Sequence, residues 1–267
     1  MAEVTSTTDI KTLIVDLDRT LLHTDKTISA YTVKVLKKCQ KRGINIMVAT
    51  ARPERETKQY SDLIDFDAMV ASNGARIIYK NQRANYGICP QSAERLLNAL
   101  NRYPNLRITV ETGDCAYSNY PIEDYETILS DDLIGVANKE GVLKILVHLD
   151  NEETIHLVKK ELTADLHDSI AHGYLLQITN AVATKWNGIK TMLNMCNCSS
   201  DETAYFGDDN DDIEPIKMCG LGIAVSNGID EVKAVADDIA ESNDADGVAK
   251  FIEYSILKNL QTLDSLS

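Results

Sequence analysis

The feature that most constrains the fold is an alternation of short apolar runs with helix-like segments early in the chain. The runs "TLIVDL" (residues 12–17), "INIMVAT" (44–50) and "AMVASNG" (68–74) are predicted strands. Between the first two, "SAYTVKVLKKCQKRG" has helical periodicity, and Ser29 and Gly43 are expected at its start and just past its end. Strands joined by helices of this length predict a parallel sheet covered on both faces.

The last third of the chain returns to this alternation, whereas the middle does not. "TAYFGD" (203–208) and "LGIAVS" (221–226) are predicted strands between helical segments. The middle mixes strand-like and helix-like segments, with "SIAHG" and "YLLQITN" as a possible hairpin pair. We therefore predict an α/β protein, with a Rossmann-like doubly wound parallel-sheet core from residues 1–82 and 181–267 and an α+β domain inserted at residues 83–180.

Composition narrows the partners that such a fold could have. The chain has 267 residues, is 44% hydrophobic and carries a net charge of -14 at pH 7. Its long-range field would repel phosphates, which argues against a nucleic-acid or anionic-membrane partner. No apolar run is long enough to span a membrane. A small phosphorylated molecule could still bind if a metal ion or a focused positive site offsets the charge.

The N-terminus and the cysteines point to the cytoplasm. "MAEVTSTTDI" has neither the basic nor the apolar region of a secretory signal. The six cysteines are scattered, and only Cys196 and Cys198 lie close together. Such a pair can bind a metal ion, but no second pair or histidine cluster completes a zinc site. We interpret all six as reduced thiols of a cytoplasmic protein, and the oligomeric state stays open.

Polar residues follow several of the predicted strands. Asp16 ends the first run, Thr50 and then Arg52 follow the second, "GDDNDD" (207–212) follows "TAYF", and Lys185 precedes a predicted helix. Each has an ordinary explanation when taken singly: a solvated turn, an N-cap, a surface lysine, or an acidic loop without the glycine and distal glutamate of a calcium loop. Ligand sites of open parallel sheets, however, collect at the carboxyl ends of strands, where these residues would meet.

Taken in order, "DLDRT", "VAT", the lysine of "ATKWNG" and "GDDNDD" resemble the four motifs of the haloacid dehalogenase-like (HAD) superfamily. Residues 221–253 are similar to the C-terminal signature of its Cof-like subfamily of phosphatases, and "SNGA" (72–75) resembles that subfamily's segment leading into the cap. The resemblance covers both ends of the chain well. It covers the middle only through the size and the strand–helix mixture of a C2-type cap, which the inserted domain would form.

The resemblance implies a Mg²⁺-dependent phosphatase that hydrolyses small phosphorylated metabolites, such as sugar phosphates, through an aspartyl phosphate on Asp16. Asp18 would protonate the leaving oxygen and then deprotonate water. Mg²⁺ would offset the repulsion between clustered carboxylates and an anionic substrate. By resemblance, the catalytic residues are Asp16, Asp18, Thr50 and Lys185; the metal ligands are Asp16, Asp18 (through its carbonyl), Asp208 and Asp212; and the substrate-binding residues are Thr50, Arg52, Lys185 and Asp211.

Three positions depart from the usual subfamily pattern. Arg19 stands where glycine is most common, Asp211 where asparagine is usual, and Trp186 where a small residue is usual. Arg19 is either a solvent-facing side chain or a contact to a second anionic group of the substrate. Asp211 could tighten metal binding or weaken a substrate contact. Trp186 is expected to pack at the start of a helix, and the alternative is that it shapes the mouth of the pocket.

Other functions and further substrate contacts stay open. A phosphosugar mutase of the same superfamily would pass the aspartyl phosphate to a sugar, and a non-catalytic phosphate-binding regulatory protein would use the fold without turnover. The sequence does not identify the substrate. "ETGDCAYSNY" (111–120) and "SIAHGYLLQ" (169–177) could face the pocket or simply be surface loops and sheet packing. The five histidines match none of the motifs, and His23 either enters the pocket or lies on the nearby surface.

Overall fold

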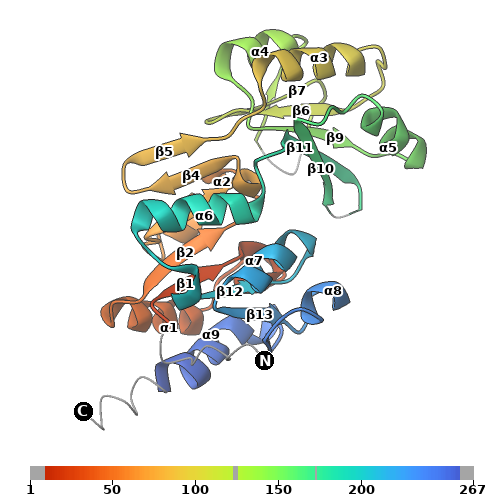
Figure 1. Ribbon diagram of the computed structural model, residues 1–267. Coiled ribbons are helices and arrows are strands. Elements are labelled where there is room, and N and C mark those ends of the chain that lie inside the picture. Colours follow the sequence, from red (N-terminus) through yellow and green to blue (C-terminus); the bar gives the residue numbers. More distant parts are fainter. Residues whose placement is uncertain (1–9, 123–125, 172, 259–267) are drawn as a thin grey trace.

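The described residues form two β-sheets (Figure 1). The computed structural model describes residues 10–122, 126–171 and 173–258. One sheet has eight strands in the order β14-β13-β12-β1-β2-β3-β4-β5, and the other has six in the order β10-β11-β9-β6-β7-β8. No helix among the described residues is long and apolar enough to cross a membrane. His172, one of the five histidines, and residues 1–9, which lack the features of a secretory signal, lie outside the described ranges.

The larger sheet is formed by both ends of the chain. Its strands are β1 (Thr12–Val15), β2 (Asn45–Ala49), β3 (Ala68–Ala71), β4 (Arg76–Tyr79), β5 (Gln82–Asn85), β12 (Thr203–Gly207), β13 (Leu221–Val225) and β14 (Asp238–Ala240). The helices of these parts are α1 (Ala30–Lys41), α2 (Glu54–Ser61), α6 (Lys185–Cys196), α7 (Ile213–Met218), α8 (Asp230–Lys233) and α9 (Gly247–Phe251). The Ser29 side chain caps α1, and Gly43 lies just beyond that helix with φ +77°, as the sequence predicted.

Strand alternation sends the apolar side chains of this sheet into two separate cores. Leu13 and Val15 of β1 pack on one face with residues of α1, α2 and α9. Ile14 points to the opposite face, where it packs with residues of α6, α7 and α8, including Trp186. Because both faces are covered by helices, the central strands are apolar after their first residue, which explains the runs seen in the sequence.

The strand order confirms the predicted doubly wound fold. The chain proceeds from β1 through β2 to β3 on one side and from β12 through β13 to β14 on the other, all in parallel. The direction therefore reverses between β1 and β12, which is where such sheets bind ligands. The antiparallel hairpin β4–β5 was not predicted, because the polar sequence "QRAN" of β5 lacks an apolar run.

The smaller sheet lies above the larger one in Figure 1 and is formed by the middle of the chain. Its strands are β6 (Ile108–Glu111), β7 (Ala116–Ser118), β8 (Ile128–Leu129), β9 (Lys144–His148), β10 (Leu166–Ala171) and β11 (Leu175–Asn180), and its helices are α3 (Pro90–Leu100), α4 (Leu133–Glu140) and α5 (Glu152–Lys159). β10 and β11 pair as the predicted hairpin. The division into a core and a cap at residues 83–180 stays a prediction, and residues 83–85 pair within the larger sheet.

The turn after β1 explains why glycine suits position 19. Residues Leu17–Leu21 form a wide turn, closed by the hydrogen bonds from Leu21 N–H to the Asp16 carbonyl oxygen and from Leu22 N–H to that of Leu17, in which Arg19 has φ 60°. This left-handed conformation costs residues with a Cβ about 1–2 kcal/mol, whereas glycine adopts it readily. The Arg19 side chain is exposed, and its carbonyl oxygen accepts a hydrogen bond of 2.8 Å from the Asn227 side chain. That hydrogen bond does not require the arginine side chain.

We expect Arg19→Gly to raise the free energy of unfolding by about 1 kcal/mol, because it relieves the left-handed backbone at the cost of some chain entropy. Urea titration followed by circular dichroism would measure the change. Arg19→Ala is the matched control: it removes the same side chain but keeps a Cβ, so it should give no gain. Equal stabilisation by both variants would contradict the backbone explanation.

Candidate active site

The carboxyl ends of neighbouring parallel strands bring the predicted site residues together. Asp16 directly follows β1, Asp208 directly follows β12, and Thr50 directly follows β2. Lys185 is the first residue of α6, whose N-cap Thr184 accepts a hydrogen bond from the Asn187 backbone N–H. Three short strands and one helix start, far apart in sequence, therefore converge on one edge of the sheet.

Three carboxylates meet at this edge. Asp16, Asp208 and Asp212 each offer one oxygen, and these oxygens lie within 4.8 Å of one another. All three residues are buried, with exposed fractions of 6%, 7% and 0%. A site made only of carboxylate oxygens suits a hard cation such as Mg²⁺. A neutral or sulfur-rich set of ligands would not suit that cation. The residues present therefore fit the metal that the sequence motifs imply.

The ammonium group of Lys185 lies against two of these carboxylates. Its Nζ donates hydrogen bonds to Asp16 Oδ1 at 3.0 Å and to Asp212 Oδ1 at 2.5 Å. Asp212 is further held by the Tyr205 hydroxyl at 2.6 Å, and its other oxygen accepts the backbone N–H groups of Asp208 and Asp209 at 2.9 and 3.1 Å. Asp212 is thus a fixed carboxylate that positions both the lysine and the loop carrying Asp208.

Burial and mutual repulsion set the protonation of this cluster. Burial, followed by the charge of Asp212, raises the pKa of Asp208 to about 7. Burial also raises the pKa of Asp16 well above its ordinary value, against the opposing charge of Lys185. Burial alone would lower the pKa of Lys185, but the charges of Asp16 and Asp212 outweigh it and raise that pKa. Lys185 therefore stays protonated. The raised pKa values of Asp16 and Asp208 indicate that a further positive charge would stabilise their ionised forms.

Asp18 forms a separate ion pair at the rim of the cluster. Both of its carboxylate oxygens accept hydrogen bonds from the Arg52 guanidinium, at 2.7 and 2.6 Å. The Asp18 side chain is 39% exposed, in contrast to the buried triad. Arg52 also lies over the Tyr60 ring. The structure therefore places Arg52 on the second aspartate of "DLD", where it fixes the orientation of that carboxylate.

Asn73 forms hydrogen bonds with two further predicted site residues, Asp211 and Thr50. Its amide donates a 2.7 Å hydrogen bond to Asp211, and its backbone N–H donates to the Thr50 carbonyl oxygen at 3.2 Å. The buried Thr50 hydroxyl accepts the Arg52 backbone N–H at 3.1 Å. Asn73 itself has φ 56°, a conformation that asparagine tolerates better than most residues. Asp211 is thus engaged by an amide at the rim of the site.

The middle of the chain contributes a residue that the sequence motifs did not indicate. Lys144, at the start of β9, is 3% exposed and donates hydrogen bonds to the Ala51 carbonyl oxygen, Asn73 Oδ1 and Gln177 Oε1 at 2.8, 2.9 and 2.8 Å. Glu111 lies 3.9 Å from its Nζ. Gln177 and Glu111 belong to the two stretches, 169–177 and 111–120, that the sequence allows to face the pocket. A lysine inside the apolar strand "KILVH" was the available signal for Lys144.

Trp186 and His23 make structural contacts away from the carboxylate cluster. Trp186 is 5% exposed and packs in the core beside α6, as predicted. His23 Nε2 lies 3.0 Å from Asp246 Oδ1, which ties the loop after β1 to the start of α9 and leaves the ring partly exposed. Neither residue is among the contacts of the carboxylate cluster described above.

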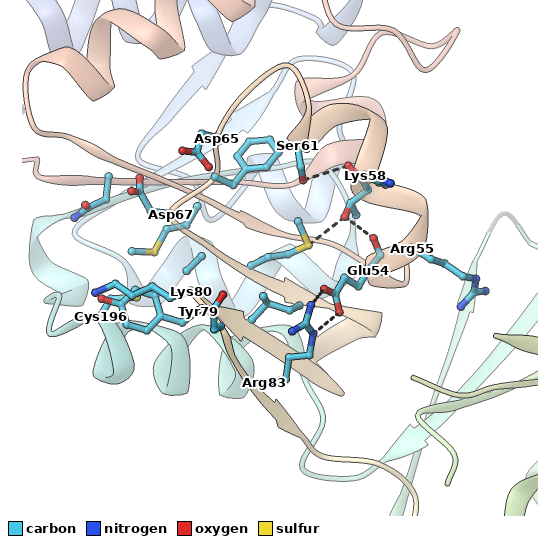
Figure 2. Close-up of a pocket in the computed structure, with 18 of the residues that line it drawn as sticks. Glu54, Arg55, Lys58, Ser61, Asp65, Asp67, Tyr79, Lys80, Arg83 and Cys196 are labelled. Carbon is cyan, nitrogen blue, oxygen red and sulfur yellow. Dashed lines mark hydrogen bonds and ion pairs between the residues drawn. The ribbon is translucent and has the colours of Figure 1, made fainter. Parts of the chain in front are cut away.

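A hollow of about 800 Å³ lies elsewhere on the larger sheet (Figure 2). Its lining includes Glu54, Lys58, Asp67, Tyr79 and Cys196, and none of the three clustered carboxylates. Within it, Glu54 accepts two hydrogen bonds from the Arg83 guanidinium, at 3.1 and 2.6 Å. Glu54 and Arg83 are thus paired with each other, and the hollow lacks the three-carboxylate cluster that suits a metal ion.

Comparisons with known proteins agree with this geometry. A family model described as haloacid dehalogenase-like hydrolase matches residues 13–252. A structure of a haloacid dehalogenase-like hydrolase from Bacteroides thetaiotaomicron has a TM-score of 0.83 and 22% identity, covering 91% of this chain and 98% of that one. At that identity the likeness shows the fold.

Two curated relatives are similar over most of this chain. The 5-amino-6-(5-phospho-D-ribitylamino)uracil phosphatase YitU of Bacillus subtilis is 24% identical, with 90% of this chain and 96% of the relative covered. The chloroplastic endoribonuclease YBEY of Arabidopsis thaliana is 28% identical over 89% of this chain, but the match spans only 45% of that longer protein. The curated relatives of this chain include a named phosphatase. Because the family model covers nearly the whole chain, the chain belongs to the haloacid dehalogenase-like hydrolases, a family of enzymes.

Proposed function

We propose that this enzyme is a Mg²⁺-dependent phosphatase that hydrolyses small phosphomonoesters through an aspartyl phosphate on Asp16. The observation that carries the proposal is the buried contact between Asp16, Lys185 and Asp212, with Asp208 beside them at the switch point of the sheet. A nucleophilic carboxylate, a fixed cation and a carboxylate metal site in one place are what stepwise phosphoryl transfer requires.

In the proposed reaction, an Asp16 oxygen attacks phosphorus and the bond to the leaving oxygen breaks. Asp18 gives that oxygen its proton, so the alcohol leaves neutral. Asp18 then takes a proton from the water that attacks phosphorus, which cleaves the bond to Asp16 and releases inorganic phosphate. The exposed, separately held Asp18 carboxylate suits this exchange with substrate and water better than the buried triad does.

The other residues would stabilise the transferring group. Lys185 would face its charge, and Thr50 would hydrogen-bond its oxygens. Mg²⁺, held by the carboxylates of Asp16 and Asp208, the Asp18 carbonyl and Asp212, would neutralise the repulsion between the anionic site and the anionic substrate. Arg52 and Asp211 would bind the substrate. In the structure they are engaged by Asp18 and Asn73, so they would exchange these partners for substrate.

A relative's named substrate and the free cysteines support a small substrate and a reducing compartment. A named relative acts on a phosphorylated ribitylaminouracil, a small metabolite, and we propose a substrate of comparable size here. The six cysteines are all free thiols, which is consistent with the cytoplasmic location that we propose.

We expect Asp16→Asn to reduce Mg²⁺-dependent hydrolysis of p-nitrophenyl phosphate by at least about 10³-fold, because an amide cannot form the acyl phosphate. Release of p-nitrophenol and of inorganic phosphate would both be measured. Asp62→Asn is the matched control, since Asp62 is an exposed aspartate at the end of α2.

Activity that survives Asp16→Asn would refute the nucleophile assignment. Transfer of the phosphoryl group to an added sugar phosphate, with little inorganic phosphate released, would identify a mutase instead. Phosphate binding without turnover by the wild-type protein would identify a regulatory protein.

We also expect the metal-free protein to lose stability as the pH rises from about 4 to 7. Over this range, folded Asp208, with its pKa raised to about 7, retains a proton that the unfolded state, with the ordinary value of 3.8, has released. The native state then binds more protons, so its stability falls with rising pH. Mg²⁺ binds the ionised carboxylates, so its stabilising effect should grow over the same range.

Thermal unfolding with EDTA or saturating MgCl₂, across this pH range, would measure both effects. Asp208→Asn should flatten the dependence on pH and reduce the stabilisation by Mg²⁺, while Asp62→Asn should change neither. A Mg²⁺-induced rise in melting temperature that is the same at low and high pH would contradict the proposed metal site.

A further inference from the structure

The loop after β13 contacts both acidic segments of the site. The Ile229 backbone N–H donates to the Asp208 carbonyl oxygen at 2.9 Å. A Cβ at Gly228 would lie 3.0 Å from that same oxygen, so glycine lets the two backbones approach this closely. The preceding residue, Asn227, donates a side-chain hydrogen bond of 2.8 Å to the Arg19 carbonyl oxygen. This loop therefore joins the segment after β12 to the turn after β1.

Asn227 is itself held by the C-terminal part of the chain. Its side-chain oxygen accepts the Asn243 backbone N–H at 2.9 Å. Asn243 is 3% exposed, and its own amide donates to the Leu22 carbonyl oxygen at 2.9 Å. Two asparagine amides thus bind two carbonyl oxygens of the turn after β1. Both lie in residues 221–253, the stretch that resembles a subfamily signature but contains none of the proposed catalytic residues or metal ligands.

The backbone angles of the turn after β1 explain why it needs such contacts. Asp18 has φ -69° and ψ 125°, and Arg19 has φ 60° and ψ 7°. These are the angles of the two central residues of a type II β-turn, whose second central position favours glycine. A residue with a Cβ there favours the type I turn, in which the peptide group between Asp18 and Arg19 faces the opposite way. Contacts from outside therefore stabilise the observed turn, and they include the Thr20 hydroxyl, which donates to Asp208 Oδ1 at 2.8 Å.

We infer that Asn227 is a positioning residue for the acid–base chemistry of Asp18. Arg52 binds the Asp18 carboxylate, whereas Asn227 binds the backbone carbonyl of the next residue. Arg52 can orient that carboxylate toward a substrate only if the backbone that carries it stays in place. A general acid must lie within hydrogen-bond reach of the leaving oxygen, and an error of about 1 Å can lower the rate by about 100-fold. The inference rests on the proposed phosphatase function and adds a residue outside its four motifs.

The leaving group of the substrate provides the test. A p-nitrophenolate ion leaves readily without a proton, phenolate leaves less readily, and the alkoxide of benzyl phosphate requires one. We expect Asn227→Asp, at saturating Mg²⁺, to lower kcat/KM for benzyl phosphate by about 10- to 100-fold. For p-nitrophenyl phosphate the loss should not exceed about 3-fold, and phenyl phosphate should show an intermediate loss. Release of inorganic phosphate would be measured for all three esters.

The choice of variants isolates one hydrogen bond. In Asn227→Asp the carboxylate keeps the shape of the amide and can still accept the Asn243 N–H, but it cannot donate to the Arg19 carbonyl oxygen. Asn227→Ala adds no charge and should show the same dependence on the leaving group. Asn105→Asp, at an exposed asparagine before β6, is the matched control for the added charge and should leave all three values unchanged.

The outcomes separate the possible failures. An equal loss on all three esters would give Asn227 a general structural role, and no loss on any of them would exclude it from the reaction. Either result overturns the inference while leaving the phosphatase function intact. A wild-type enzyme inactive on p-nitrophenyl phosphate would instead contradict the proposed function on which the inference rests. Melting temperatures would show that the variants are folded, and Asn227→Ala would replace Asn227→Asp if the latter were not.

Discussion

The buried ammonium of Lys185 is the interaction on which the rest of the site depends. It pairs with Asp16 and Asp212, and a buried ion pair of this kind is costly when one partner is lost. The two carboxylates repel each other, so Lys185 holds both of them in place, and the hydroxyl of Tyr205 gives Asp212 a further hydrogen bond. Three elements of the doubly wound fold bring these groups together. Asp16 follows β1, the loop after β12 carries Asp212, and α6 begins with Lys185.

The strands at the switch point could be predicted because their burial is visible in the sequence as short apolar runs. Strands covered on both faces are apolar throughout, so β1, β2, β3, β12 and β13 stand out, and the polar residue after each marks the edge that binds ligands. The convergence of Asp16, Lys185 and Asp208 followed from that edge together with the family motifs. Their catalytic roles and the domain boundaries remain predictions.

The parts that could not be predicted depend on contacts between distant segments. The sequence marks Lys144 only as a charged residue at the start of an apolar strand, and tertiary packing alone places its ammonium against the Ala51 carbonyl oxygen. The ion pair of Arg52 with Asp18 joins two motifs that the sequence could only place at the same edge. The β4–β5 hairpin escaped notice because its outer strand is polar and largely exposed, so periodicity carries little information there.

Asn73 has a consequence for the timing of turnover. One end of its amide accepts from Lys144 and the other donates to Asp211, so it bridges the smaller sheet to the loop after β12. A separation of the two sheets would break the contacts of Lys144 to Asn73 and Ala51 together and return a buried ammonium to water. Such an opening would be a concerted event with its own barrier, and this bridge would then set the interval between chemical cycles.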